Sequence, residues 1–129
     1  MKKARVLFIT PNLIGIKDGL NRIQPSLGLM TISQSLIDNN HTVKIHDTAL
    51  EGWKRRIDIG NNKIITGQSD REIENVIREF NPDIVGISIL FSNLNSSGHD
   101  IARIVKKINQ SILVMIGGNH ISNSLIDYQ

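Results

Sequence analysis

The sequence predicts an α/β domain in which helices cover both faces of a mostly parallel sheet. Four short apolar runs rich in β-branched residues recur along the 129 residues, at 6–10, 42–46, 84–90 and 112–116. Their hydrophobicity is continuous rather than alternating, which is typical of parallel strands buried on both faces. Helical patterns separate the runs, and connections between parallel strands are right-handed. We therefore expect a three-layer Rossmann-like (flavodoxin-type) doubly wound parallel sheet.

Three helices are expected between the strands, and a fourth begins near residue 122. The patterns cover residues 25–38, 69–80 and 97–108. Ser69 and Glu72 have the capping-box spacing, and Ser97 with Asp100 repeats this N-terminal signature.

The stretch 48–68 is long for a connection between a strand and a helix. Ile57 and Ile59 precede Gly60-Asn61-Asn62, and Ile64-Ile65 follows it, which favours a small β-hairpin. A flavodoxin-type sheet normally has a fifth strand, which this chain lacks. We expect residues 1–129 to form one domain, cut from the N-terminal part of a longer protein.

The composition narrows the class of protein. A hydrophobic share of 40%, a charged share of 21% and a net charge of +3 are those of a globular domain. No apolar run approaches the roughly 20 residues of a membrane span, and the apolar run at 6–9 is too short for a signal peptide. We expect a cytoplasmic protein that binds neither membrane nor nucleic acid, since its basic residues form no continuous stripe.

The sequence contains no cysteine, so the chain has no disulfide and no thiolate to bind zinc or an iron–sulfur cluster. Its four histidines lack the spacing of a metal site. We therefore assign no catalytic residue and no metal ligand to the chain.

Two neighbouring strands of the expected sheet end in small residues. Ser88 lies near the end of the run at 84–90, and Gly117-Gly118 follows the next run. Ligands of open α/β sheets bind beyond the carboxyl ends of the strands, so this edge is the candidate site. Two structural explanations remain open: Ser88 could bond to nearby backbone, and the glycines could form a tight turn.

Other uses of this architecture match poorly. The residues after the first strand, 10–19, lack the glycine spacing of a dinucleotide or Walker site. A phosphoacceptor domain needs an aspartate where Ser88 stands. A flavin mononucleotide site needs a hydroxyl-rich loop, whereas residues 11–15 are mostly apolar.

Residues 85–90 and 114–118 resemble the Ser-x-Leu and Gly-Gly elements of cobalamin-binding domains. With residues 24–30, 81–88 and 117–120, the chain is similar to the N-terminal domain of B12-dependent radical SAM enzymes, the methyltransferases and anaerobic cyclases. The resemblance covers nearly the whole chain.

The resemblance implies that cobalamin lies across the carboxyl ends of the strands, with its nucleotide tail in a crevice. Ser88 would hydrogen-bond the benzimidazole of the tail, Leu90 would shape the slot, and the two glycines would let the tail pass. The cofactor-binding residues implied in this way are Ser88, Leu90, Ser92, Gly117, Gly118, Asn119 and His120.

One feature differs from methionine-synthase-like domains, which carry Asp-x-His-x-x-Gly after the first strand. No histidine occurs between Pro11 and Pro25 here, and His46 follows the second strand instead. The resemblance therefore implies a base-off, His-off cobalamin that carries a methyl group.

The same resemblance implies a fused radical SAM barrel with a [4Fe-4S] cluster and S-adenosylmethionine, which makes the whole protein an enzyme although this chain alone is none. Two alternatives stay open: a domain with a structural or interaction role that binds no corrinoid, and a stand-alone sensor of a small molecule.

Overall fold

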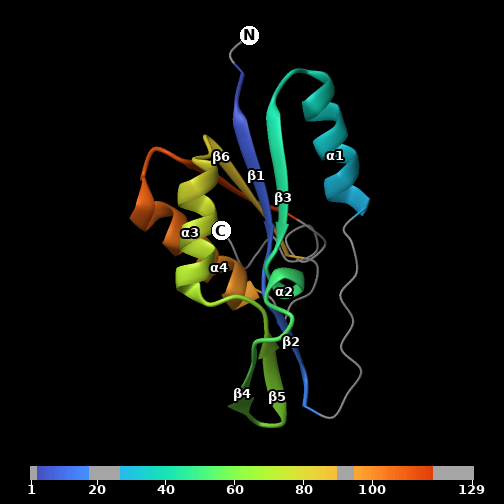
Figure 1. The fold of residues 1–129 in the computed structure, drawn as a ribbon, viewed down its shortest axis with the longest axis vertical. Coiled ribbons are helices and arrows are strands. Elements are labelled where there is room, and N and C mark those ends of the chain that lie inside the picture. The colour runs from blue at the N-terminus through green and yellow to red at the C-terminus, as the bar shows by residue number, and fades with distance from the viewer. Residues whose placement is uncertain (1–2, 18–26, 90–94, 118–129) are drawn as a thin grey trace, which may run out of the picture.

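A four-stranded parallel sheet in the order β3-β1-β6-β7 lies at the centre of the structure (Figure 1). The computed structural model describes residues 3–17, 27–89 and 95–117. The strands are β1 Arg5–Thr10, β3 Thr42–Asp47, β6 Ile84–Ser88 and β7 Leu113–Gly117. The prediction of four parallel strands is confirmed, although the run expected to continue to Leu90 ends as a strand at Ser88.

Helices lie on both sides of this sheet, which confirms the three layers (Figure 1). The helices are α1 Leu27–Asp38, α2 Thr48–Glu51, α3 Asp70–Phe80 and α4 Asn95–Ile108. Helices α3 and α4 cover one face, which we call the α3–α4 face, and α1 lies on the opposite face, the α1 face, against β3. No helix in the described parts of the chain is long and apolar enough to cross a membrane.

The hydrophobic core fills the space between the sheet and the α3–α4 face. Its buried members are all aliphatic: Leu7, Ile9, Ile73, Ile77, Val85, Ile87, Ile89, Ile101, Val105 and Ile112. β-Branched side chains pack well on a pleated surface, and burying each one contributes about 1.5–3 kcal/mol. The core therefore fixes which side of β1 and β6 faces the helices, and so which side faces α1.

The N-terminus of α3 has the predicted capping box. The Ser69 hydroxyl accepts a hydrogen bond from the Glu72 N–H at 3.2 Å, and the Ser69 N–H donates to the Glu72 carboxylate at 3.1 Å. The hydrogen bond from the Ser69 N–H, and then that from its hydroxyl, hold the pKa of Glu72 below its usual value. Asn81 ends the helix in the left-handed conformation, with φ 52°.

The predicted start of α4 at Ser97 is wrong. The helix begins at Asn95, so Ser97 lies inside its first turn and does not cap it. This turn packs closely on the sheet: a Cβ at Gly98 would lie 2.5 Å from Cδ1 of Ile89. Packing of the turn against β6 thus extends the helix beyond the cap that the local sequence suggests.

A second, antiparallel sheet in the order β2-β5-β4 projects past the carboxyl end of β1 (Figure 1). Its strands are β2 Leu13–Ile16, β4 Arg56–Gly60 and β5 Lys63–Thr66. The predicted hairpin is confirmed as β4 and β5, and Asn61 and Asn62 supply the positive φ values of its turn. Strand β2 and the short helix α2 were not predicted.

A polar cluster fastens this small sheet to the parallel one. The Asn12 side-chain amide donates to the Gln68 carbonyl at 2.8 Å, and its oxygen accepts from the Gln68 N–H at 3.0 Å. The His46 ring Nε2 lies 2.6 Å from the Gln68 side-chain oxygen, and both side chains are buried. Gly67 has φ 147°, and a Cβ there would strike the Asn12 side chain. This junction therefore requires glycine.

Candidate functional site

Ser88 and Gly117 lie side by side at the carboxyl edge of the parallel sheet. They are register partners in β6 and β7, and the Ile89 N–H donates to the Gly117 carbonyl at 2.8 Å. Register partners in a sheet point to the same face, so both positions belong to one patch of surface. The prediction that the serine and the first glycine end neighbouring strands is confirmed.

This patch lies on the α1 face of the sheet. Ile87 and Ile116, which precede the two residues, pack into or against the core under α3 and α4. Because side chains alternate along a strand, Ser88 and Gly117 turn away from that core. Ser88 is buried, with 6% of its surface exposed, whereas Gly117 is exposed.

The space beside Gly117 is open in the described structure. A Cβ built on Gly117 would meet no described atom within 4 Å, and its φ lies outside the left-handed region. Gly86, one strand away, is different: a Cβ there would lie 2.6 Å from the Phe8 ring. Packing thus explains the glycine at 86, whereas neither backbone conformation nor described neighbours explain the glycine at 117.

The neighbouring surface of β7 is apolar and uncovered. Leu113 and Met115 alternate with Val114 and Ile116 and are 54% and 58% exposed, on the same face as Gly117. Phe8, packed across Gly86, continues this surface toward the centre of the sheet. Ser88 and Gly117 therefore lie at the end of an exposed apolar strip.

Two further residues border the edge on this face. Thr10 and Asp47 are register partners at the ends of β1 and β3. The Thr10 carbonyl accepts from the Thr48 hydroxyl at 2.8 Å, and the Asp47 carboxylate accepts from the Ala49 N–H at 3.0 Å. The described hydrogen bonds of both residues thus stabilise the start of α2. Both residues end strands that the sequence predicts, so their place at this edge was predictable, although the sequence assigned neither of them a role in binding.

The two histidines beside β3 lie away from the Ser88–Gly117 edge. His46 is the register partner of Ile9, so it lies on the α3–α4 face, where it bonds Gln68. His41 lies at the opposite, amino edge, and its Nδ1 accepts from the Ala4 N–H at 3.0 Å. His41 is half-buried by this contact. Within the described ranges, no group of three His, Asp or Glu side chains could hold a metal ion.

Two hollows in the described structure lie away from this edge. One, of about 390 Å³, lies between the small sheet and the starts of α3 and α4, lined by Ile57, Ile65 and Ile101 among others. The other, of about 320 Å³, lies at the amino edge beside Ala4 and Asp83. Neither Ser88 nor Gly117 lines either of these two hollows.

Five of the predicted cofactor-binding residues lie outside the described residues. They are Leu90, Ser92, Gly118, Asn119 and His120. Their roles stay predictions.

Comparison with known proteins identifies the family. Residues 19–126 match the B12 binding domain. The chain is 32% identical over 118 residues to cytidylyl-2-hydroxyethylphosphonate methyltransferase of Streptomyces wedmorensis, covering 90% of this chain and 22% of that protein. It is 30% identical over 123 residues to an uncharacterized methyltransferase of Pyrococcus horikoshii, covering 95% of this chain and 23% of that protein.

The chain therefore spans less than a quarter of the length of these two relatives. No solved structure matches it. A family match over most of the chain, on a parallel α/β sheet of the expected type, is decisive, and the chain belongs to the B12-binding domain family.

Proposed function

We propose that this domain holds cobalamin for a methyltransferase, with the nucleotide tail of the cofactor seated at the Ser88–Gly117 edge. The observation that carries the proposal is the open space beside Gly117, next to the buried Ser88, at the end of an apolar strip. A side-chain-free position that the described packing does not require is expected where a ligand passes close to backbone.

The described residues fit the tail in three ways. The Ser88 hydroxyl would donate a hydrogen bond to the benzimidazole nitrogen, which otherwise costs about 1–3 kcal/mol when buried without a partner. Gly117, together with Gly118, would leave room for the tail beside β7. Leu113 and Met115 offer exposed apolar surface that binding would cover. Leu90, Ser92, Asn119 and His120 complete the proposed site.

The proposal includes a cobalt to which neither histidine beside β3 supplies a ligand. His46 points to the α3–α4 face and is bonded to Gln68, and His41 lies at the opposite edge. Bringing His46 to the Ser88 edge would break a buried hydrogen bond and pull the ring through the sheet. A base-off, His-off state is therefore the state that the domain favours in this proposal.

When bound, cobalamin supplies a carrier for a methyl group. The two methyltransferase relatives support this use, and their additional length leaves room for a catalytic domain. We propose that this partner is a radical SAM barrel, with S-adenosylmethionine and a [4Fe-4S] cluster whose cysteines this chain does not supply. In this arrangement the present domain binds and orients the cofactor, and the partner holds the substrate.

Mixing the purified domain with hydroxocobalamin, desalting it and recording its visible spectrum tests the proposal. We expect retained cofactor with a base-off spectrum. Ser88→Ala should weaken retention about tenfold, whereas the matched exposed substitution Ser111→Ala, at the opposite edge, should not. A folded protein that retains no cofactor would refute the proposal and favour a structural or interaction role.

A further inference from the structure

Strand β4, the outer strand of the small sheet, presents an edge to which no described strand pairs. All five of its residues, Arg56–Gly60, are exposed, including Ile57 at 41% and Ile59 at 45%. Unpaired edges carrying large apolar side chains are templates for pairing with another chain. The chemistry of this edge therefore indicates which chain it accepts.

The backbone of β4 offers two residues for such pairing. The Arg55 carbonyl accepts from the Gly67 N–H at 3.1 Å, so Arg55 directs its carbonyl toward the β5 side. Backbone polar groups alternate between the two edges of a strand. Arg56 and Asp58 therefore direct theirs to the outer edge.

Few antiparallel registers let two copies of β4 pair through these groups. One places Arg56 opposite its own counterpart, and another does the same for Asp58, so each sets like charges directly opposite, which is destabilising. A third register is centred on Ile57. It places Arg56 opposite Asp58 of the second copy, and the two-fold axis repeats this ion pair. Ile57 then faces Ile57 of the second copy on the other side of the sheet.

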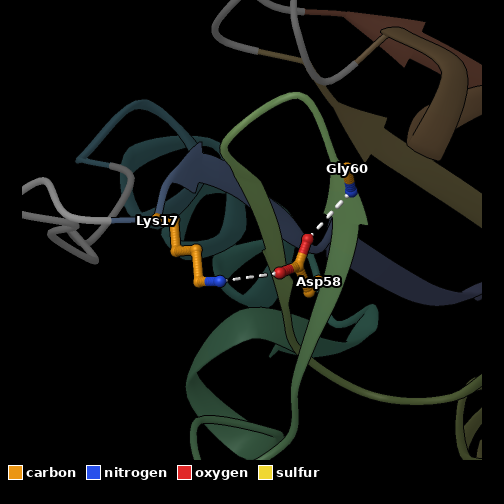
Figure 2. A network of polar contacts seen from close by, with 3 residues as sticks. All are labelled: Lys17, Asp58 and Gly60. Atoms are coloured by element: carbon orange, nitrogen blue, oxygen red, sulfur yellow. Dashed lines mark hydrogen bonds and ion pairs between the residues drawn. The ribbon is translucent and has the colours of Figure 1, made fainter.

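Both charged side chains are already held in place. The Arg56 guanidinium stacks on the Trp53 ring, 4.6 Å from its centroid. The Asp58 carboxylate accepts from the Gly60 N–H at 2.9 Å and pairs with the Lys17 ammonium at 3.0 Å (Figure 2). The Gly60 hydrogen bond and then Lys17 hold the pKa of Asp58 below its usual value. Less side-chain freedom is therefore lost when each meets an opposite charge.

We propose that β4 is a self-association edge, through which two copies of this chain pair antiparallel around Ile57 with reciprocal Arg56–Asp58 ion pairs. The two small sheets then form one continuous six-stranded sheet. The irregularity between Asp58 and Gly60 limits the paired length. Such a short contact forms a weak, reversible dimer, as is typical of interfaces below about 1,200 Å².

Sedimentation equilibrium of the 129-residue chain, from roughly 10 µM to 1 mM, tests the pairing in the range of weak complexes. The variants Arg56→Asp and Asp58→Arg each place like charges opposite one another twice. We expect each to raise the dimer dissociation constant at least about tenfold. An equimolar mixture of the two variants restores opposite charges at both positions, so the mixture should dimerise about as well as the original chain.

Arg71→Asp, the same charge change on the exposed surface of α3, is the matched control and should leave dimerisation unchanged. Thermal unfolding confirms that each variant is folded, and recovery in the mixture requires two folded partners. A chain that stays monomeric at 1 mM, or a dimer that neither substitution weakens, or a mixture that fails to associate, overturns the proposal.

Discussion

Replacing Asn12 by alanine removes the pair of hydrogen bonds that joins the β1–β2 connection to the start of α3. The Asn12 side chain bonds both the N–H and the carbonyl of Gln68, at 3.0 and 2.8 Å. Each bond contributes about 0.5–1.5 kcal/mol net, and a buried group left without a partner costs about 1–3 kcal/mol more. We expect Asn12→Ala to lower the free energy of unfolding by about 2–6 kcal/mol, a large part of the 5–15 kcal/mol typical of a domain.

Urea denaturation followed by circular dichroism measures this loss, and the slope of the transition reports whether the small sheet still unfolds with the rest. Asn75→Ala, at an exposed position of α3, is the matched control, and it should change stability by less than about 0.5 kcal/mol. If Asn12→Ala also falls within that range, the two bonds do not fasten the small sheet, and the reasoning is refuted.

Three other outcomes follow from the contacts described. Gly86→Ala should destabilise the domain by about 1–3 kcal/mol, because its Cβ would lie 2.6 Å from the Phe8 ring, and Phe8→Leu in the same chain should recover part of the loss in a urea titration. Gly117→Val should leave the unfolding midpoint nearly unchanged, since its side chain enters open space, yet abolish cobalamin retention after desalting; a retained cofactor would count against the proposed tail site. Because the pKa of Glu72 is lowered in the folded state, its contribution to stability is present above its usual pKa of 4.5 and is lost as the pH falls through the folded pKa. Glu72→Gln keeps a hydrogen-bonding side chain, so its melting temperature should fall less between pH 7 and pH 3, and an equal fall contradicts the assignment.

The parallel sheet was predictable because its signals are local. Continuous β-branched runs mark β1, β3, β6 and β7, and Ser69 with Glu72 marks the start of α3. Strand β2 of the small sheet was not predicted, because the signal for it is not local. Leu13–Ile16 has four residues, too few for a periodic pattern, and it becomes a strand only by pairing with Lys63–Thr66, far along the chain.

The residues of the candidate site also divide into those that local signals predict and those that only strand register brings together. Ser88 and Gly117 could be predicted as neighbours because each ends a recognisable strand, and β6 and β7 follow one another around the sheet. Phe8 and Gly86 could not, because their contact depends on the register between β1 and β6. Sequence motifs thus placed Ser88 and Gly117 of the candidate site side by side, whereas the apolar strip beside them required coordinates.

Only Pro11 and Asn12 separate β1 from β2, so a two-residue connection joins the central strand to the projecting sheet. Pro11 is buried with its φ restricted by the ring, and Asn12 is tethered at both ends of its amide. A two-residue connection held in this way leaves little conformational freedom between the small sheet and the carboxyl end of β1, beside β6. We therefore expect a force on the small sheet to reach the carboxyl end of β1.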